Sequence, residues 1–149
     1  VPYDPRAGSG VLVERFRVGG LDRSPEPWLL EIVAGLIDTD EEPAEVARRE
    51  AREEADLELH DLLPVMTYYP SPGGSDERVY LYVGRCSTVG VGGVFGVEEE
   101  GEDIRVHVWP LADALKAVQD GRIDNAASII ALQWLALNKE QVKADWLRL

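Results

Sequence analysis

Three glutamates occur at relative positions i, i+3 and i+4 in the segment Arg49-Glu50-Ala51-Arg52-Glu53-Glu54. With 3.6 residues per helical turn, Glu50, Glu53 and Glu54 share one face of a helix. Like charges at this spacing repel one another and destabilise a bare helix. A hard divalent cation would reverse that cost, because Mg²⁺ prefers oxygen ligands that converge on one point. The pattern therefore predicts a helix that carries metal ligands.

The helix itself is expected over residues 43–55. Pro43 suits its first position, because the N–H that proline lacks would have no partner within the helix there. A stripe of small residues lies beside the glutamates and would let the helix approach a sheet closely. This stripe comprises Ala44, Ala47, Ala51 and Ala55. The alternative interpretation is a solvated charged helix, which is the usual one for a segment rich in Glu and Arg.

Runs of β-branched and aromatic residues predict strands on both sides of this helix. The expected strands cover residues 11–17, 28–34, 65–69, 78–86 and 104–109. Further helices are expected at 111–119 and from a cap at Asp124 or Asn125 to the C-terminus, whereas residues 87–103 show neither pattern. This order of elements predicts an α+β fold, and the length favours a single domain spanning residues 1–149.

The composition limits the classes of partner. The chain carries a formal net charge of −13, which argues against nucleic acid and anionic membranes. We expect a soluble cytoplasmic protein, because no apolar stretch is long enough to cross a membrane and no signal peptide is evident. Cys86, the single cysteine, follows an apolar run and is interpreted as a buried thiol rather than a nucleophile.

A second acidic segment, with Glu98, Glu100 and Glu102, follows several glycines between residues 90 and 101. A long acidic loop inside a compact domain is more often functional than accidental. We expect this loop, the acidic helix, Ala34-Gly35 and the loop from Ser71 to Arg78 to converge. Phosphoanhydride hydrolysis suits such a site, because carboxylates supply both the metal ligands and a base for the attacking water.

The spacing around the acidic helix resembles the box that marks Nudix hydrolases. Five residues separate Gly35 from Glu41, seven separate Glu41 from Arg49, and the Arg-Glu-x-x-Glu-Glu core follows directly. One position departs from the family, since Asp56 stands where a glycine usually follows the helix. We expect Asp56 to adopt a left-handed conformation at a cost of up to about 1 kcal/mol.

Most of the remaining chain resembles the ADP-ribose pyrophosphatase branch of that family, of the bacterial type. The similarity lies in Pro72 within Ser-Pro-Gly-Gly-x-x-Glu-Arg and in residues 28–35, 98–108 and 123–135. The resemblance implies the Nudix fold, a mixed β-sheet sandwiched between α-helices. It also implies hydrolysis of ADP-ribose to AMP and ribose 5-phosphate by a homodimer. The cofactor it implies is Mg²⁺, two or three ions per site, with Mn²⁺ or another divalent cation as the alternative.

The resemblance assigns roles residue by residue. The metal ligands it implies are the main-chain carbonyl of Ala34 and the carboxylates of Glu50, Glu54 and Glu102, with Glu53 as a further ligand. It implies Glu100 as the general base. The positions that match substrate contacts are Arg17, Leu36, Ser71, Pro72, Gly73 and Glu77. Arg49 and Glu41 are interpreted as a pair that braces the loop against the helix rather than as catalytic groups.

Two other functions stay open. The substrate of the same chemistry could be another nucleoside diphosphate sugar, and a Nudix domain that only senses a nucleotide is the non-enzymatic alternative. In the branch that this chain resembles, an N-terminal segment of β-strands precedes the catalytic domain and contributes to the dimer and the adenine pocket. Nothing in this sequence corresponds to that segment, and we expect it to lie upstream of Val1.

Overall fold

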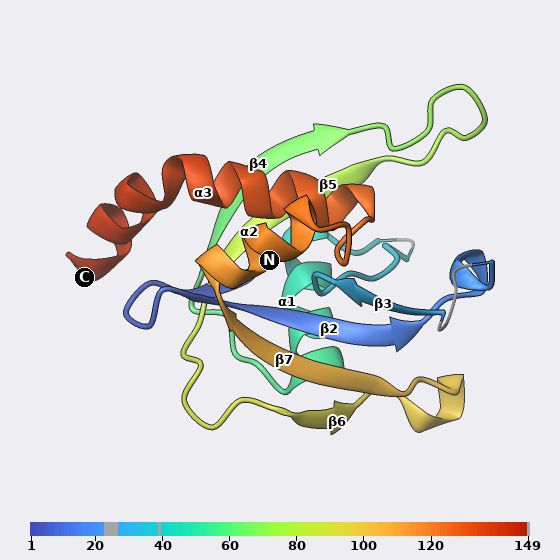
Figure 1. Cartoon of the computed structure of the whole chain (residues 1–149), viewed down its shortest axis with the longest axis horizontal. Coiled ribbons are helices and arrows are strands. Elements are labelled where there is room, and N and C mark those ends of the chain that lie inside the picture. Colours follow the sequence, from blue (N-terminus) through green and yellow to red (C-terminus); the bar gives the residue numbers. More distant parts are fainter. Residues whose placement is uncertain (23–26, 39, 149) are drawn as a thin grey trace.

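The computed structural model describes residues 1–22, 27–38 and 40–148, so Thr39 of the loop before the acidic helix lies outside the described residues. The described residues form one sheet, three α-helices and two short 3-10 turns (Figure 1). The strands are β1 (Pro2–Asp4), β2 (Ser9–Phe16), β3 (Trp28–Glu31), β4 (Asp61–Tyr68), β5 (Val79–Arg85), β6 (Gly93–Phe95) and β7 (Ile104–Pro110). The helices are α1 (Pro43–Ala55), α2 (Leu111–Gln119) and α3 (Ala126–Leu147), and the 3-10 turns are Val18–Gly20 and Glu98–Glu100.

The sheet is mixed, and β2 lies at its centre. Within the described residues the strand order is β4-β5-β1-β2-β7-β6, with β3 paired to β2 beside β1. The β1–β5 pair is parallel, and the other pairs are antiparallel. The α+β prediction is therefore confirmed. The pairing of β1 with β5 joins the β4–β5 hairpin to the strands around β2 in one sheet.

Helices cover both faces of the sheet, which gives the molecule two hydrophobic cores. Val11 and Val13 of β2 pack with Ala51 and Ala55 of α1, whereas Leu12 packs on the opposite face with α2 and α3. This alternation follows from the two-residue period of a strand. In Figure 1, α1 lies behind the sheet from α2 and α3. The expected sandwich of a mixed sheet between helices is confirmed.

The ends of α1 match the sequence expectations. Pro43 is its first residue, and Asp56 caps its C-terminus with φ 50° and ψ 41°, in the left-handed region. The Asp56 N–H donates to Arg52 and the Leu57 N–H to Ala51, so the last carbonyls of the helix find partners. The helix α3 begins after Asn125, whose side chain accepts a hydrogen bond from the Ser128 N–H at 3.3 Å. Helix starts and stops were therefore predicted well.

Strand boundaries were predicted less well. Residues 93–95, expected to form neither helix nor strand, form the edge strand β6 by pairing with β7. The strand β1 was not expected, β3 ends three residues early at Glu31, and β4 begins four residues early at Asp61. Pairing decides these bounds, because hydrogen bonds with β5 extend β4 back to Asp61. The register of this pair shifts between Pro64 and Met66.

Two further findings concern Cys86 and the length of the apolar helices. The Cys86 thiol is buried, as expected, and burial raises its pKa to about 12, which makes it a poor nucleophile. Across the described parts of the chain, none of the helices is long and apolar enough to span a membrane.

Candidate active site

The carboxylate of Glu54 lies at the centre of the site. Glu54 comes from the last turn of α1 and is only 1% exposed. Its Oε1 accepts a hydrogen bond from Arg15 Nη1 at 2.7 Å, and its Oε2 accepts one from the Ala34 N–H at 3.1 Å. Burial raises the pKa of Glu54 to about 7, although the positive charge of Arg15 opposes the shift. The charge of Arg15 therefore does not fully offset the cost of burying the Glu54 carboxylate.

Arg15 joins the acidic helix to the acidic loop. Its Nη2 donates to Glu102 Oε1 at 2.9 Å, and Glu102 Oε2 accepts a hydrogen bond from the Val97 N–H at 3.2 Å. Sequence reasoning missed Arg15. The available signal was the period of β2, since Arg15 lies on the same strand face as Val11 and Val13, which pack on α1.

A second arginine, Arg49, serves the outer carboxylates of α1. Its Nε and Nη2 donate to the two carboxylate oxygens of Glu41, each at 3.1 Å. Its Nη1 contacts Glu50 at 2.8 Å and Glu53 at 3.2 Å. The hydrogen bonds from Arg49 lower the pKa of Glu41. The expected pairing of Arg49 with Glu41 is therefore present, and it ties the loop to the helix.

These arginines correct one premise of the sequence analysis. Repulsion among the glutamates of α1 was expected to be relieved by a metal, but two guanidinium groups already provide counter-charge. Arg49 pairs with Glu41, Glu50 and Glu53, and Arg15 pairs with Glu54 and Glu102, so the counter-charge is partial. The signal was present in the sequence, because Arg49 and Glu53 stand at the i, i+4 spacing of a helical ion pair.

Gly35 lets the loop before α1 touch the carboxylates directly. A Cβ atom at this position would lie 1.9 Å from Glu50 Oε1 and 2.1 Å from its Cδ, which is far inside van der Waals contact. The neighbouring Ala34 N–H meanwhile donates to Glu54. The approach of the loop to the Glu50 carboxylate, as it lies in this structure, therefore depends on the absence of a side chain at residue 35.

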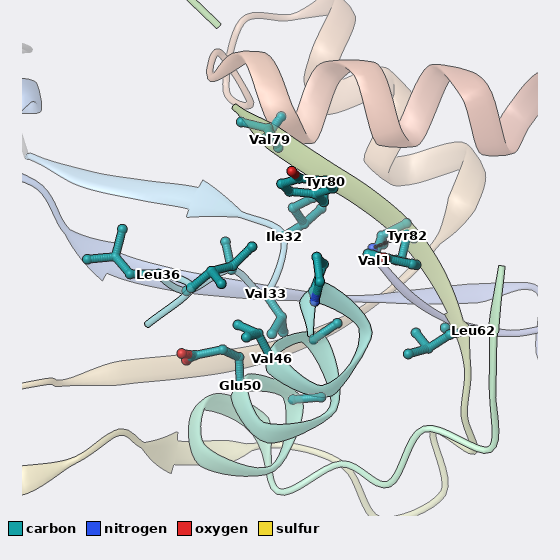
Figure 2. Close-up of a pocket in the computed structure, with 18 of the residues that line it drawn as sticks. Val1, Ile32, Val33, Leu36, Val46, Glu50, Leu62, Val79, Tyr80 and Tyr82 are labelled. Atoms are coloured by element: carbon teal, nitrogen blue, oxygen red, sulfur yellow. Dashed lines mark hydrogen bonds between the residues drawn. The ribbon is translucent and has the colours of Figure 1, made fainter. Parts of the chain in front are cut away.

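A cavity of about 750 Å³ lies beside this cluster, within the size range of small-molecule sites. In Figure 2, Leu36 and Glu50 border it from the loop and α1, and Val79 and Tyr80 border it from β5. The candidate residues that line it are Ala34, Leu36, Glu50 and Glu77. The structure thus brings one edge of the expected metal cluster and two of the expected substrate contacts to one cavity.

Other candidate residues lie outside that cavity. Arg17 forms a two-point ion pair with Glu31, with distances of 2.9 and 2.7 Å. The stretch from Ser71 to Gly73 is exposed in the loop between β4 and β5, and the Ser71 carbonyl accepts the N–H groups of Gly74 and Ser75. Glu100 is exposed in the 3-10 turn of the acidic loop. The structure therefore does not gather all the expected contacts in one place.

The residues present fit a divalent cation in charge and in donor type. Five carboxylates, those of Glu41, Glu50, Glu53, Glu54 and Glu102, share two guanidinium groups, which leaves a formal charge of minus three. Burial raises the pKa of Glu50 as well as that of Glu54. Among the described residues, however, no three acidic, His or Cys side chains converge on one point. The oxygen donors suit a hard cation, but their arrangement is that of carboxylates paired with arginine.

Comparison with known proteins places this geometry in context. The family model described as NUDIX domain matches residues 2–142. The chain is 46% identical over 146 residues to a protein named ADP-ribose pyrophosphatase from Escherichia coli strain K12, covering 98% of this chain and 70% of that protein. It is 39% identical over 151 residues to a protein of the same name from Haemophilus influenzae, covering 99% of this chain and 70% of that protein.

A more distant relative carries a different name. The chain is 36% identical over 139 residues to a protein named GDP-mannose pyrophosphatase from Cronobacter sakazakii, covering 91% of this chain and 70% of that protein. The relatives thus share a pyrophosphatase name and differ in the nucleotide sugar that the name contains.

Proposed function

The chain belongs to the NUDIX domain family, and on that premise we propose that it hydrolyses the pyrophosphate bond of ADP-ribose to AMP and ribose 5-phosphate in a reaction that depends on Mg²⁺. The observation that carries this proposal is the 46% identity, over nearly the whole chain, to a protein named ADP-ribose pyrophosphatase. A relative named for GDP-mannose is 36% identical, which makes another nucleoside diphosphate sugar the second candidate.

Four groups would hold the metal: the carbonyl of Ala34 and the carboxylates of Glu50, Glu54 and Glu102, with Glu53 as a further ligand. Two or three divalent cations per site are part of this proposal, with Mn²⁺ as the alternative to Mg²⁺. When bound, such cations neutralise phosphate oxygens and lower the pKa of a coordinated water. The formal charge of minus three that the arginines leave on the cluster supports this assignment.

Glu100 is proposed as the general base, which takes the proton of the attacking water. Its carboxylate is exposed and makes no hydrogen bond or ion pair with the other described residues, which leaves both oxygens open to an attacking water. The following residue, Gly101, has φ 68°, in the left-handed region. We propose that the two carboxylates of the acidic loop divide its work, with Glu100 as base and Glu102 as ligand.

The substrate contacts are proposed at Arg17, Leu36, Ser71, Pro72, Gly73 and Glu77. Leu36 and Glu77 border the cavity beside α1. Arg17 uses Nε and Nη2 on Glu31, and among the described residues its Nη1 has no partner and is left for a phosphate oxygen. The exposed loop from Ser71 to Gly73 offers backbone N–H groups to the substrate.

The test is to mix the protein with ADP-ribose and Mg²⁺ and to quantify AMP and ribose 5-phosphate. ADP-glucose and GDP-mannose, at equal concentration, serve as competing substrates. We expect the highest kcat/KM for ADP-ribose. A higher value for either competitor would transfer the proposal to that sugar, and binding of ADP-ribose without product would favour a nucleotide sensor.

A homodimer and a cytoplasmic location complete the proposal. Both are implied by the resemblance to bacterial ADP-ribose pyrophosphatases. Light scattering at micromolar concentration would give the mass of the assembly, and a monomer mass would contradict the first of these points.

A further inference from the structure

Arg15 stands where three elements meet. It extends from the face of β2 that packs on α1, and its side chain is 15% exposed. One arm of its guanidinium group reaches Glu54 on α1 at 2.7 Å, and another arm reaches Glu102 on the acidic loop at 2.9 Å. These two carboxylates are 48 residues apart in sequence and share this one cation.

The two carboxylates need that cation whenever no metal is bound. An unpaired carboxylate as deeply buried as that of Glu54 is strongly unfavourable, because burial removes its hydration. With Arg15 in place, every oxygen of the pair has a protein donor: Ala34 N–H and Arg15 serve Glu54, and Val97 N–H and Arg15 serve Glu102. Arginine stays charged at every physiological pH, so only a change of geometry can remove this charge.

We propose that Arg15 is a resident counter-cation of the metal centre. It holds Glu54 and Glu102 together while no divalent cation is bound, and it competes with that cation for the same two carboxylates. The inference rests on the proposed function, because it takes Glu54 and Glu102 as metal ligands. Two consequences follow. Arg15 lowers the affinity of the site for metal, and it holds the acidic loop beside α1 before metal binds.

The neighbouring arginines do not share this role. Arg17 follows the end of β2 and pairs with Glu31, and Arg49 pairs with Glu41, Glu50 and Glu53. Arg105 on the adjacent strand β7 is exposed, pairs in register with Glu14, and has no side-chain partner among the described residues. Arg105 therefore offers a control with the same change in net charge.

Metal affinity is the first measurement. Mn²⁺ and Mg²⁺ are titrated calorimetrically, without substrate, into the wild type, Arg15→Gln, Arg15→Lys and Arg105→Gln. Removal of a positive charge a few Å from the bound cation should tighten metal binding at least about tenfold in Arg15→Gln. Arg105→Gln should match the wild type. Arg15→Lys keeps the charge, so its affinity should stay within a few-fold of the wild type.

Loop docking is the second measurement. In EDTA, hydrogen exchange at residues 96–103 should be faster in Arg15→Gln than in the wild type, and the melting midpoint should fall by several degrees. Saturating Mg²⁺ should reduce both differences. Arg15→Lys should also exchange faster in EDTA, because a single ammonium group lacks the fork that spans two carboxylates. If Arg15→Gln does not fold, Arg15→Lys carries this test.

The outcomes separate the two proposals. Equal or weaker metal binding in Arg15→Gln, or unchanged exchange in both variants, would overturn the role of Arg15. Failure of every protein to bind a divalent cation would overturn both this role and the proposed metal centre. Tighter binding in Arg15→Gln together with no hydrolysis of ADP-ribose by the wild type would support Arg15 and overturn the proposed function alone.

Discussion

Two buried carboxylates, Asp4 and Glu54, occupy environments that differ in their donors. Asp4 is 6% exposed and accepts four hydrogen bonds. Its Oδ1 accepts the N–H groups of Arg6 and Ala7 at 2.9 and 3.1 Å, and its Oδ2 accepts the N–H and the hydroxyl of Thr88 at 2.8 and 3.0 Å. Burial alone would raise the pKa of Asp4, but these hydrogen bonds lower it below its ordinary value.

Glu54 is more deeply buried and has fewer donors. It receives one hydrogen bond from Arg15 and one from the Ala34 N–H, while Glu50 and Glu102 add negative charge nearby. Burial consequently raises its pKa to about 7. Burial and the number of donors together decide the character of a carboxylate, and the four donors of Asp4 outweigh its burial. Asp4 is a satisfied structural group, whereas Glu54 keeps a demand for positive charge.

The largest expected effect on turnover is that of substituting Glu100, an exposed carboxylate unlike the buried Asp4 and Glu54. Glu100→Gln keeps the size of the side chain but cannot take a proton, so turnover of ADP-ribose should fall about 10²–10⁴-fold with metal affinity unchanged. Glu102→Gln should instead weaken metal binding, and extra Mg²⁺ should restore part of its rate. Rates measured against Mg²⁺ concentration distinguish the two. Near-normal turnover in Glu100→Gln would eliminate it as the base.

Glu54→Gln tests the carboxylate of this pair that is proposed to bind metal. Partners that merely orient metal ligands are typically worth 10–100-fold in activity, so loss of a ligand should lower turnover by more than about 100-fold. The wild type should gain about 2.7 kcal/mol of stability from a cation at a hundred times its dissociation constant, and Glu54→Gln should lose most of that gain. Melting in EDTA and in Mg²⁺ measures it. Asp4→Asn is the control and should keep the full gain.

Asp4→Asn tests the carboxylate of this pair that serves the fold. An amide cannot accept all four hydrogen bonds, so the free energy of unfolding should fall by about 1–3 kcal/mol, with turnover within a few-fold of the wild type. Because the folded state lowers the pKa of Asp4, the folded protein binds fewer protons than the unfolded chain between the two values. The advantage of the wild type should therefore be complete well above pH 3.8 and shrink as pH falls through the lower folded pKa. Urea unfolding between pH 3 and 7 tests this, and an advantage that is constant with pH would contradict it.

The smallest effect is expected at Asp56, which ends the helix that carries Glu54. A glycine adopts φ 50° without the strain of a side chain, so Asp56→Gly should raise the free energy of unfolding by up to roughly 1 kcal/mol. Turnover should stay within a few-fold. Thermal melts and rates with ADP-ribose check both statements, and a large loss of activity would assign Asp56 a role beyond ending the helix.

The sequence predicted those elements whose signals are local. Pro43 and Asp56 bound α1 as expected, because helix ends depend on the conformations that neighbouring residues allow. The strand β6 escaped prediction because the segment Gly93–Phe95 has no strand pattern of its own and depends on hydrogen bonds with β7. Pairing between distant segments leaves little trace in either one.

The site shows the same limit. The helix period gave the shared face of Glu50, Glu53 and Glu54, but it carried no information about their partners on other elements. Arg15 lies 39 residues from Glu54 along the chain, and Thr88 lies 84 residues from Asp4. The pairing of such residues follows from the tertiary fold, although the period of β2 places Arg15 on the strand face toward α1. The resemblance to the Nudix family predicted the family correctly, whereas the roles of individual residues stay predictions.

The position of β2 has a consequence for the order of events during synthesis. Its partner β7 is completed about 90 residues after β2 itself. At typical elongation rates of about 5–20 residues per second, β2 waits roughly 5–20 s on the ribosome before that edge is covered. Val11 and Val13 lack their full core during this interval, because Ile104 and Val106 of β7 contribute to it. The strand that carries Arg15 is thus made well before β7, the strand that covers its second edge.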